Sequence, residues 1–214
     1  MSVRRLLVLG ANNPETVRVV QSINDAAPTF ELVGFLDNDP AKHGKPSWGF
    51  PVLGGSDLVA EPRYRDCVVA NAITRDTLTR QQTTAELERF GAELTNLIHP
   101  AVDTRHVELG RGIVIHEGAL LQPGAVVGNN CALNGHTVVS HECVLGDHVF
   151  MAPGSVLAGL VHLGAGVMIG VHATVLPRLQ IGEWATVGGG AVVISNVPAR
   201  AIVAGNPARL LRQQ

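Results

Sequence analysis

Hydrophobic residues in the second half of the chain recur with a period of six. From Leu97 to Pro198, every six-residue block begins with an aliphatic residue or methionine, except the block that begins with Asp103. The fifth position is always apolar or small, as in LQPGAV, LNGHTV and VSHECV, and the register never slips. An α-helix has no such period, whereas a short strand followed by a turn produces it. Three blocks then form one triangular coil of about 18 residues, which predicts a left-handed parallel β-helix with the first and fifth positions inside.

A second pattern covers residues 1–96. Leu6 to Leu9 form a continuous apolar run, which predicts a strand buried on both faces, and PETVRVVQSI predicts a helix after it. FELVGFLDND and CVVANA predict two more strands, and TRQQTTAELERFGAEL predicts a helix that ends near Gly91. Strands that alternate with helices indicate a small Rossmann-like parallel sheet. We therefore expect an α/β domain over residues 1–96 and the β-helix, with a C-terminal tail, over residues 97–214.

Composition narrows the class of protein. The 214 residues carry a formal net charge of -2, which gives no general attraction to nucleic acid or to anionic membranes. The three cysteines, Cys67, Cys131 and Cys143, have no disulfide-framework spacing, and the apolar run near the N-terminus lacks the length of a signal peptide. We expect a cytoplasmic protein that inserts into no membrane and binds no nucleic acid.

The carboxyl ends of the predicted parallel strands form the first candidate site. Ligands of open parallel sheets bind at this edge, which here means Gly10 to Asn13 and Asp37 to Asp39. The loop GANNPE lacks a GxGxxG pattern, so we expect no dinucleotide cofactor. A packing domain that binds no ligand stays open as an alternative.

The second candidate site is the triplet His141, Glu142 and Cys143. Eight of the nine histidines fall in the repeat and none occupies an inward first or fifth position, so we expect them at the surface, at corners or at subunit contacts. By itself the triplet fits a catalytic group, a metal site or three ordinary residues of a strand, and imidazole titrates near neutral pH.

With a Rossmann-like domain, a β-helix and a terminal AGNPAR, the chain resembles the bacterial nucleotide-sugar N-acetyltransferases of the bacillosamine and perosamine type. It also resembles the sialic acid O-acetyltransferases of the same hexapeptide-repeat superfamily. The resemblance lies in LNGHTVVSHECVLGDHVFMAPGSVLAG, VGGGAVVISNV and VAGNPARLL. It implies acetyl-CoA-dependent, metal-free acetylation of an amino group on a nucleotide-linked amino sugar, for bacterial surface glycan synthesis. It further implies a homotrimer whose active sites lie between subunits.

The resemblance implies roles for individual residues. His141 is the general base, Glu142 raises its basicity, and Asn134 positions the base or the acceptor. Coenzyme A is expected at Phe150, Val171, Gly189, Gly205, Asn206 and Pro207. The nucleotide-linked sugar is expected at Gly10, Asn12, Asn13, Asp37, Asn38 and Gly55.

Two stretches depart from the family pattern. The family usually has a HIAPG motif whose histidine lies near the acetyl group, whereas this chain has FMAPG with Phe150. Phenylalanine donates no hydrogen bond, so that contact is lost or comes from another group such as His148. The family loop GAGGHG is replaced by GANNPE, in which Asn12 and Asn13 offer hydrogen bonds but Pro14 removes a backbone donor. A different nucleotide, a different acceptor and a lost sugar site stay open.

Three other functions stay open. The same base and groove serve a hydroxyl acceptor, which makes a sugar O-acetyltransferase. The two departures also fit a non-catalytic structural or regulatory trimer. GHTVVSHEC further resembles the gamma-class carbonic anhydrases, because His136 and His141 have the spacing of two of their zinc ligands. The third ligand of that class would fall at Pro100, one place from His99.

Overall fold

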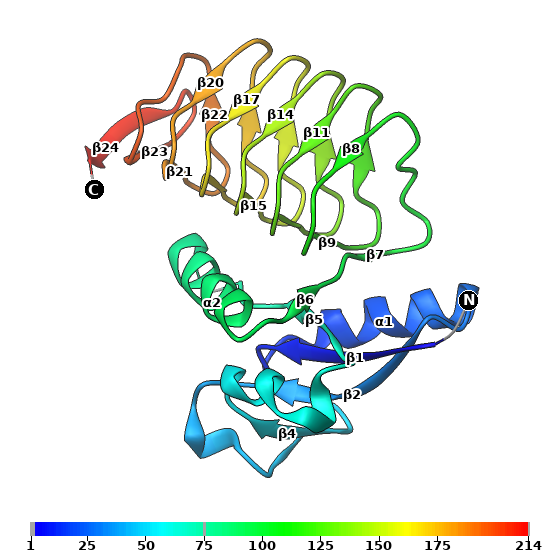
Figure 1. Cartoon of the computed structure of the whole chain (residues 1–214). Helices are drawn as coiled ribbons and strands as arrows, with labels where there is room; N and C mark the ends of the chain where they lie inside the picture. Colours follow the sequence, from blue (N-terminus) through cyan, green and yellow to red (C-terminus); the bar gives the residue numbers. More distant parts are fainter. Residues whose placement is uncertain (1–2, 75, 214) are drawn as a thin grey trace.

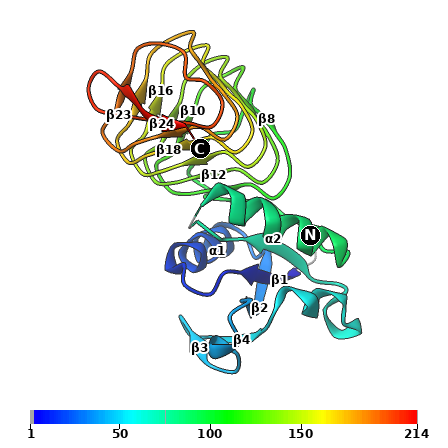
Figure 2. The same ribbon diagram turned by 90° about the vertical axis from the view of Figure 1, so that its left-hand side faces the viewer.

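The computed structural model describes residues 3–74 and 76–213, which form two packed parts. A β-helix lies on an N-terminal α/β part, and helix α2 (Thr77–Arg89) runs between the N-terminal sheet and the coils (Figures 1 and 2). The predicted fold class, an α/β domain followed by a left-handed parallel β-helix, is confirmed. Among the described residues, no helix is both long enough and apolar enough to span a bilayer.

The N-terminal sheet explains the continuous apolar run near the start of the chain. Its central strand β1 (Arg4–Leu9) pairs in parallel with β2 (Phe30–Leu36) and β5 (Val68–Asn71). Leu6 and Val8 of β1 enter one core, which contains residues of α1 (Pro14–Ala26), and Leu7 and Leu9 enter a second core. Both faces of the strand are therefore buried, as the sequence predicts.

Short elements complete this sheet, whose strand order is β3-β4-β2-β1-β5-β6. The sequence pattern did not predict them, because two- to five-residue strands and single turns carry little periodicity. They are the strands β3 (Pro46–Ser47), β4 (Phe50–Gly54) and β6 (Glu93–Leu94) and the 3-10 turns η1 (Pro40–Lys42), η2 (Ser56–Ala60) and η3 (Pro62–Tyr64).

The β-helix has three parallel sheets, one along each side of a triangular coil (Figure 2). The β12 side, which faces the N-terminal part, contains β7 (Leu97–Ile98), β9 (Val114–Ile115), β12 (Ala132–Leu133), β15 (Phe150–Met151), β18 (Met168–Ile169), β21 (Thr186–Val187), β23 (Ala201–Ala204) and the antiparallel β24 (Arg209–Gln213). The β13 side contains β10 (Leu120–Leu121), β13 (Val138–Val139), β16 (Val156–Leu157), β19 (Thr174–Val175) and β22 (Val192–Val193). The β14 side contains β8 (Glu108–Leu109), β11 (Val126–Val127), β14 (Val144–Leu145), β17 (His162–Leu163) and β20 (Gln180–Ile181).

The corners between these sides repeat one backbone conformation. The fourth position is left-handed in every block from residue 103 to residue 192, with φ between 53° and 80°. Glycine adopts this conformation freely, but Glu142 and Leu160 adopt it at a cost on the order of 1 kcal/mol each. Because successive coils stack in register, residues 18 positions apart form columns along each corner, as the pairing of Leu120 with Val138 shows.

The interior follows the predicted first and fifth positions. Leu133, Val139 and Cys143 are fully buried. Burial raises the pKa of the Cys143 thiol, and its Sγ–H donates to the carbonyl oxygen of Ala158 at 3.1 Å. The cysteine of the His-Glu-Cys triplet is therefore a core residue rather than a nucleophile.

One prediction about the histidines was wrong. His116, at the second position of its block, is only 7% exposed, and burial lowers its pKa. It follows β9 on the β12 side, where the N-terminal part covers the coils. The repeat pattern distinguishes the inside of a coil from its outside, but it does not show which outer side a second domain covers.

We predict that Leu133→Ala lowers the free energy of unfolding by about 2–5 kcal/mol, because it leaves a cavity between hydrogen-bonded coils. Leu78→Ala is the matched control, since Leu78 lies on α2 and is 53% exposed, and should cost less than about 1 kcal/mol. Urea denaturation followed by circular dichroism measures both variants. Equal losses would contradict the assignment of the first positions to the interior.

Candidate active site

A cavity of about 740 Å³ opens where the N-terminal sheet meets the β-helix. The loops after β1, β2 and β5 and the first half of α2 form most of its lining, and the β-helix contributes Asn134 and Phe150. The structure therefore brings seven predicted site residues of both domains into one cavity. These residues are Gly10, Asn12, Asn13, Asp37, Asn38, Asn134 and Phe150. A cavity of this size accommodates a ligand of nucleotide dimensions.

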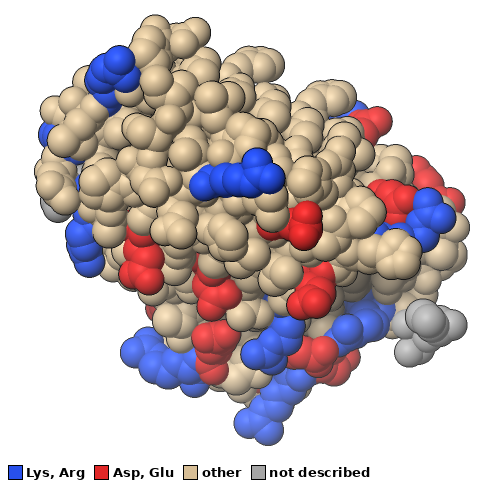
Figure 3. Space-filling view, turned by 90° about the horizontal axis from the view of Figure 1, so that it is seen from above, with Lys and Arg blue, Asp and Glu red and all other residues tan. Residues whose placement is uncertain are grey.

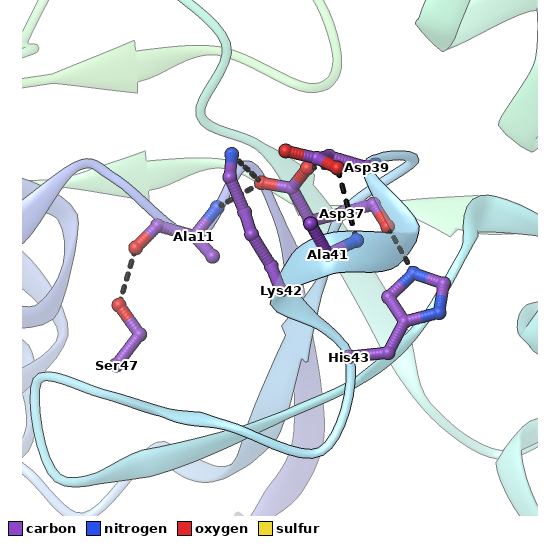
Figure 4. Close-up of polar contacts among 7 residues, drawn as sticks. All are labelled: Ala11, Asp37, Asp39, Ala41, Lys42, His43 and Ser47. Atoms are coloured by element: carbon purple, nitrogen blue, oxygen red, sulfur yellow. Dashed lines mark hydrogen bonds and ion pairs between the residues drawn. The ribbon is translucent and has the colours of Figure 1, made fainter.

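Asp37 holds the rim of this cavity together (Figure 4). Lys42 Nζ donates to Asp37 Oδ2 over 2.7 Å, and the backbone N–H groups of Ala11 and Asp39 donate to the carboxylate at 3.2 and 3.0 Å. Burial by itself raises the pKa of Asp37, but these hydrogen bonds outweigh burial and hold that pKa below its ordinary value. The ionised carboxylate thereby fixes the β1–α1 loop to the turn after β2.

Asn38 connects the rim of the cavity to η2 and α2. The Oδ1 of Asn38 accepts the N–H of Ser56 at 2.9 Å, and its Nδ2 donates to Glu86 at 3.0 Å. Gly55 lies outside the cavity lining, next to Asn38, and a Cβ added there would lie 3.4 Å from Asn38 Oδ1. Both amide atoms of Asn38 are thus engaged within the chain.

Asn13 joins two of the cavity loops. It stands at the N-terminus of α1 without a side-chain capping bond, and its Nδ2 instead donates to the carbonyl oxygen of Ala72 at 3.3 Å. The first N–H groups of α1 are therefore not capped by this side chain.

Asn134 and Phe150 give the cavity its β-helix wall. Asn134 Nδ2 donates to the carbonyl oxygen of Met151 at 2.8 Å, which fixes its side chain against the next coil. Phe150 packs with Ala132, Ala152 and Met168 in an apolar cluster on the β12 side. A ligand in this cavity therefore meets an aromatic ring at the position of the family histidine.

His148 does not take the place of that histidine. Its Nδ1 lies 2.8 Å from Nδ2 of Asn130, and the ring lines a separate, smaller cavity beside α2. Burial lowers the pKa of His148, which favours the neutral ring there.

His141 and Glu142 form an exposed pair at the corner after β13. In the tautomer that donates from Nδ1, His141 binds Glu142 Oε2 over 3.1 Å, and the two side chains are 55% and 64% exposed. Gln122 Oε1 accepts the backbone N–H of His141 at 2.9 Å. The ring lies against Gly159, where an added Cβ would be 2.3 Å from His141 Nε2. Nδ1 is thus engaged, and Nε2 is the remaining acceptor.

This pair does not line the cavity that contains Asn134. Asn134 precedes β13 and His141 follows it, so the two residues lie at opposite edges of the β13 side. A regular ladder of coils therefore keeps the two candidate sites of one chain apart, and we refer to them below as the half-sites.

Five of the residues predicted to bind coenzyme A lie along the edge between the β12 and β13 sides, which is also the edge that contains Asn134. Val171 and Gly189 occupy this corner in later coils, which stack about 4.8 Å apart. Their backbone N–H groups donate to no backbone carbonyl in the described part of the chain. Gly205, Asn206 and Pro207 follow at the end of the edge, where the Gly205 carbonyl accepts the N–H of Val192 at 3.0 Å. A line of free backbone donors suits an extended ligand that carries amide carbonyls.

A zinc site of the carbonic anhydrase kind does not assemble within one chain. Over residues 3–74 and 76–213, no three or more His, Cys, Asp or Glu side chains are placed to hold a metal ion. His136 and His141 lie on either side of β13, at opposite edges of the β13 side. Within one chain, their sequence spacing therefore does not bring them together.

Sequence reasoning missed several residues that shape the two half-sites. Gly159 follows His141 by one 18-residue coil, so the column rule alone would have identified it. Lys42, Thr79 and Thr83 line the cavity from a turn and a helix, where no motif indicates that they converge.

We predict that Lys42→Met raises the pKa of Asp37 and removes about 1 kcal/mol of unfolding free energy at pH 7. The side chains of Asp37 and Lys42 are 12% and 30% exposed, so solvent screens their ion pair only in part. Because the folded-state pKa of Asp37 is lowered, its contribution exists above the unfolded-state pKa and vanishes as the pH falls through the folded-state pKa.

Urea unfolding from neutral to acidic pH measures this difference, with Lys45→Met on the exposed hairpin as the control. A difference between wild type and Lys42→Met that stays constant down to the acidic end would contradict the role given to the ion pair.

Comparison with known proteins places this geometry in context. No family model matches the chain. The acetyltransferase domain of PglB from Neisseria gonorrhoeae is 30% identical with a TM-score of 0.85, over 97% of this chain and 100% of that domain. A variant of perosamine N-acetyltransferase from Caulobacter crescentus, solved with CoA and GDP-perosamine, is 27% identical with a TM-score of 0.87, over 99% of both chains.

Several curated acetyltransferases match a short segment of this chain. Serine acetyltransferase 2 from Arabidopsis thaliana is 42% identical over 50 residues, which are 23% of this chain and 16% of that protein. The match thus spans well under two thirds of that relative's length. The full-length similarity to the PglB domain, in contrast, confirms the predicted resemblance. The chain belongs to the bacterial sugar N-acetyltransferase family of hexapeptide-repeat proteins.

Proposed function

We propose that this protein transfers the acetyl group of acetyl-CoA to the amino group of a nucleotide-linked amino sugar. The observation that carries the proposal is the similarity, over almost the whole chain, to perosamine N-acetyltransferase, whose solved structure contains CoA and GDP-perosamine. The cavity between the two parts of the chain and the exposed His141–Glu142 pair supply the groups that this reaction needs.

The cavity suits the nucleotide-linked sugar. The first turn of α1, which the side chain of Asn13 does not cap, lies at the lining, and a helix N-terminus carries partial positive charge that favours a phosphate group. Lys42 lies in the same lining, where it is paired with Asp37, so a phosphate group would share its ammonium group with that carboxylate. The Phe150 ring offers an apolar surface against which the nonpolar face of a sugar ring packs.

His141 is the general base of the proposed reaction. Its Nε2 takes a proton from the attacking amine while the new C–N bond forms, and the thioester C–S bond breaks. The imidazolium then returns this proton to the departing thiolate, so that an amide and free coenzyme A are the products. Glu142, which accepts the Nδ1–H, holds the required tautomer and stabilises the imidazolium. Such assistance typically contributes about 10²- to 10⁴-fold to the rate.

The two half-sites meet only if copies of the chain associate. Leu120, Leu176 and Ile194 on the β13 side and its edge are 49%, 39% and 47% exposed. Viewed from the side opposite the N-terminal part, the coils carry few charged side chains (Figure 3). Exposed apolar surface of this kind favours contact with another protein surface.

We propose a homotrimer in which the β13 sides face one another around a three-fold axis. Rotation about that axis brings the His141 edge of one subunit to the Asn134 edge of the next. Each active site then combines His141 and Glu142 of one subunit with the cavity of its neighbour. Acetyl-CoA lies in the groove between them, along Val171 and Gly189.

Release of the coenzyme A thiol from acetyl-CoA tests the proposed reaction. The assay uses UDP-, dTDP- and GDP-linked sugars with an amino group at carbon 3 or 4, each paired with its hydroxyl counterpart. We expect release with an amino sugar and none with its counterpart. Release with the hydroxyl sugar alone would indicate O-acetylation, and no release with any sugar would contradict the proposal in favour of a non-catalytic trimer.

We predict that Gly159→Ala lowers kcat by about 10- to 100-fold, because its methyl group displaces the His141 ring. Gly159 is not left-handed, so alanine adopts its backbone conformation. His141→Ala should lower kcat at least about 100-fold without loss of the fold.

The double variant is the control for this prediction. If Gly159 acts only through the ring, His141→Ala with Gly159→Ala is no slower than His141→Ala alone. A further loss in the double variant, or near-full activity of His141→Ala, would contradict the role assigned to the ring.

A further inference from the structure

The corner that follows the β14 side leaves carbonyl groups for helix α2 to bind. At this corner, the carbonyl oxygen of the third residue of a block accepts the N–H of the fourth residue in the next coil. The carbonyl oxygen of Asn129, for example, accepts the N–H of His148 at 2.8 Å. Helix α2 binds three of the fourth-position carbonyls, those of Gly112, Asn130 and Gly166. Thr77 Oγ1 donates to the carbonyl oxygen of Gly166 at 2.8 Å.

Arg80 makes two more such bonds from the same helix. Its Nε donates to the carbonyl oxygen of Asn130 at 2.8 Å, and its Nη2 donates to that of Gly112 at 3.4 Å. Successive coils of the β-helix are thus joined to one guanidinium group of the N-terminal part.

The other side of the same guanidinium binds the wall of the large cavity. Arg80 Nη1 donates to the carbonyl oxygens of Asn71 and Ile73 at 2.6 and 3.1 Å. The Oδ1 of Asn71 accepts the N–H of Ile73 at 3.0 Å. Ile73 and its neighbours, residues 72 and 74, line the cavity that Asn134 lines from the β-helix.

Arg80 is an unusual residue to find in this place. It is 1% exposed, and its hydrogen bonds within the described residues all go to carbonyl oxygens, none to a carboxylate. Burial lowers its pKa to about 10, so the group is still a cation at neutral pH. Only a guanidinium group, with five donors in a planar fork, reaches carbonyls in two directions at once; lysine presents its donors from a single atom.

We propose that Arg80 is a positioning residue, which sets the wall of the nucleotide-sugar cavity against the β-helix edge that carries Asn134. The identity of the ligand in this statement rests on the function proposed above. Without the guanidinium group, buried carbonyls of the coils and of residues 71–73 lose their shared donor and relax independently. The cavity then no longer holds its ligand at the correct distance from Asn134 and from the His141–Glu142 pair of the neighbouring subunit.

Two variants and two readouts test this proposal. Arg80→Met removes the charge, Arg80→Lys keeps the charge without the fork, and Arg89→Met on the exposed end of α2 is the matched control. In both Arg80 variants we expect amide hydrogen exchange of residues 71–74 to rise at least about tenfold, while residues 6–9 of β1 stay protected. The KM for the nucleotide sugar should rise about tenfold, with the KM for acetyl-CoA within about twofold of wild type.

Unchanged exchange at residues 71–74 in Arg80→Lys would overturn the proposal. So would exchange that rises throughout the N-terminal sheet together with equal changes in both KM values, because that result describes general loss of stability. If Arg80→Met fails to fold, Arg80→Lys carries the same comparison. A wild-type protein that turns over no nucleotide sugar refutes the proposed function, and the exchange result still decides whether Arg80 positions the wall.

Discussion

A left-handed corner recurs at the fourth position of each six-residue block, and the rest of this structure depends on it. It turns the chain between sides of the triangular coil, so strands of two residues stack in exact columns 18 residues apart. Where a corner residue is not glycine, the strain is on the order of 1 kcal/mol, and hydrogen bonds between coils offset it. Glu142 is one of these residues, with φ at 56°, and its conformation places the His141–Glu142 pair outside the coil.

The same regularity separates the two halves of the site. A ladder of coils cannot bend one edge toward another, so Asn134 and His141 stay on opposite sides of β13. The N-terminal part adds the cavity to one edge only, and α2 fixes it there by binding corner carbonyls through Thr77 and Arg80. Rigid columns, exposed apolar residues on the β13 side and its edge, and a cavity on one edge together favour the proposed site shared between copies of the chain.

Much of this arrangement follows from the sequence, because its main signal is periodic. The period of six predicts the β-helix and its interior, and the apolar run of β1 predicts a strand buried on both faces. Resemblance directed attention to Asn134 and Phe150, and both line the cavity with the loops after β1 and β2. The roles predicted for them in catalysis and cofactor binding stay predictions.

The remaining features depend on tertiary contacts that leave no periodic trace. The short strands β3, β4 and β6 arise from pairing at the two ends of the N-terminal sheet, and the burial of His116 arises from packing between the two parts. Lys42 reaches Asp37 across a turn, and Arg80 meets carbonyls from distant segments. Neither contact is encoded by spacing along the chain. Gly159 is different, because it lies 18 residues after His141 and the repeat alone predicts that the two residues are adjacent.

Subunit complementation tests the shared site most directly. One chain carries His141→Ala, and the other carries Thr79→Trp, whose indole fills the cavity lined by Thr79. The two chains are co-expressed with different tags, and mixed trimers are purified. Each variant alone should be inactive, and the purified mixed trimers should show about a third of wild-type activity, because one of their three sites combines an intact base with an intact cavity. Mixed trimers as inactive as either parent would show that the site does not combine residues of two chains.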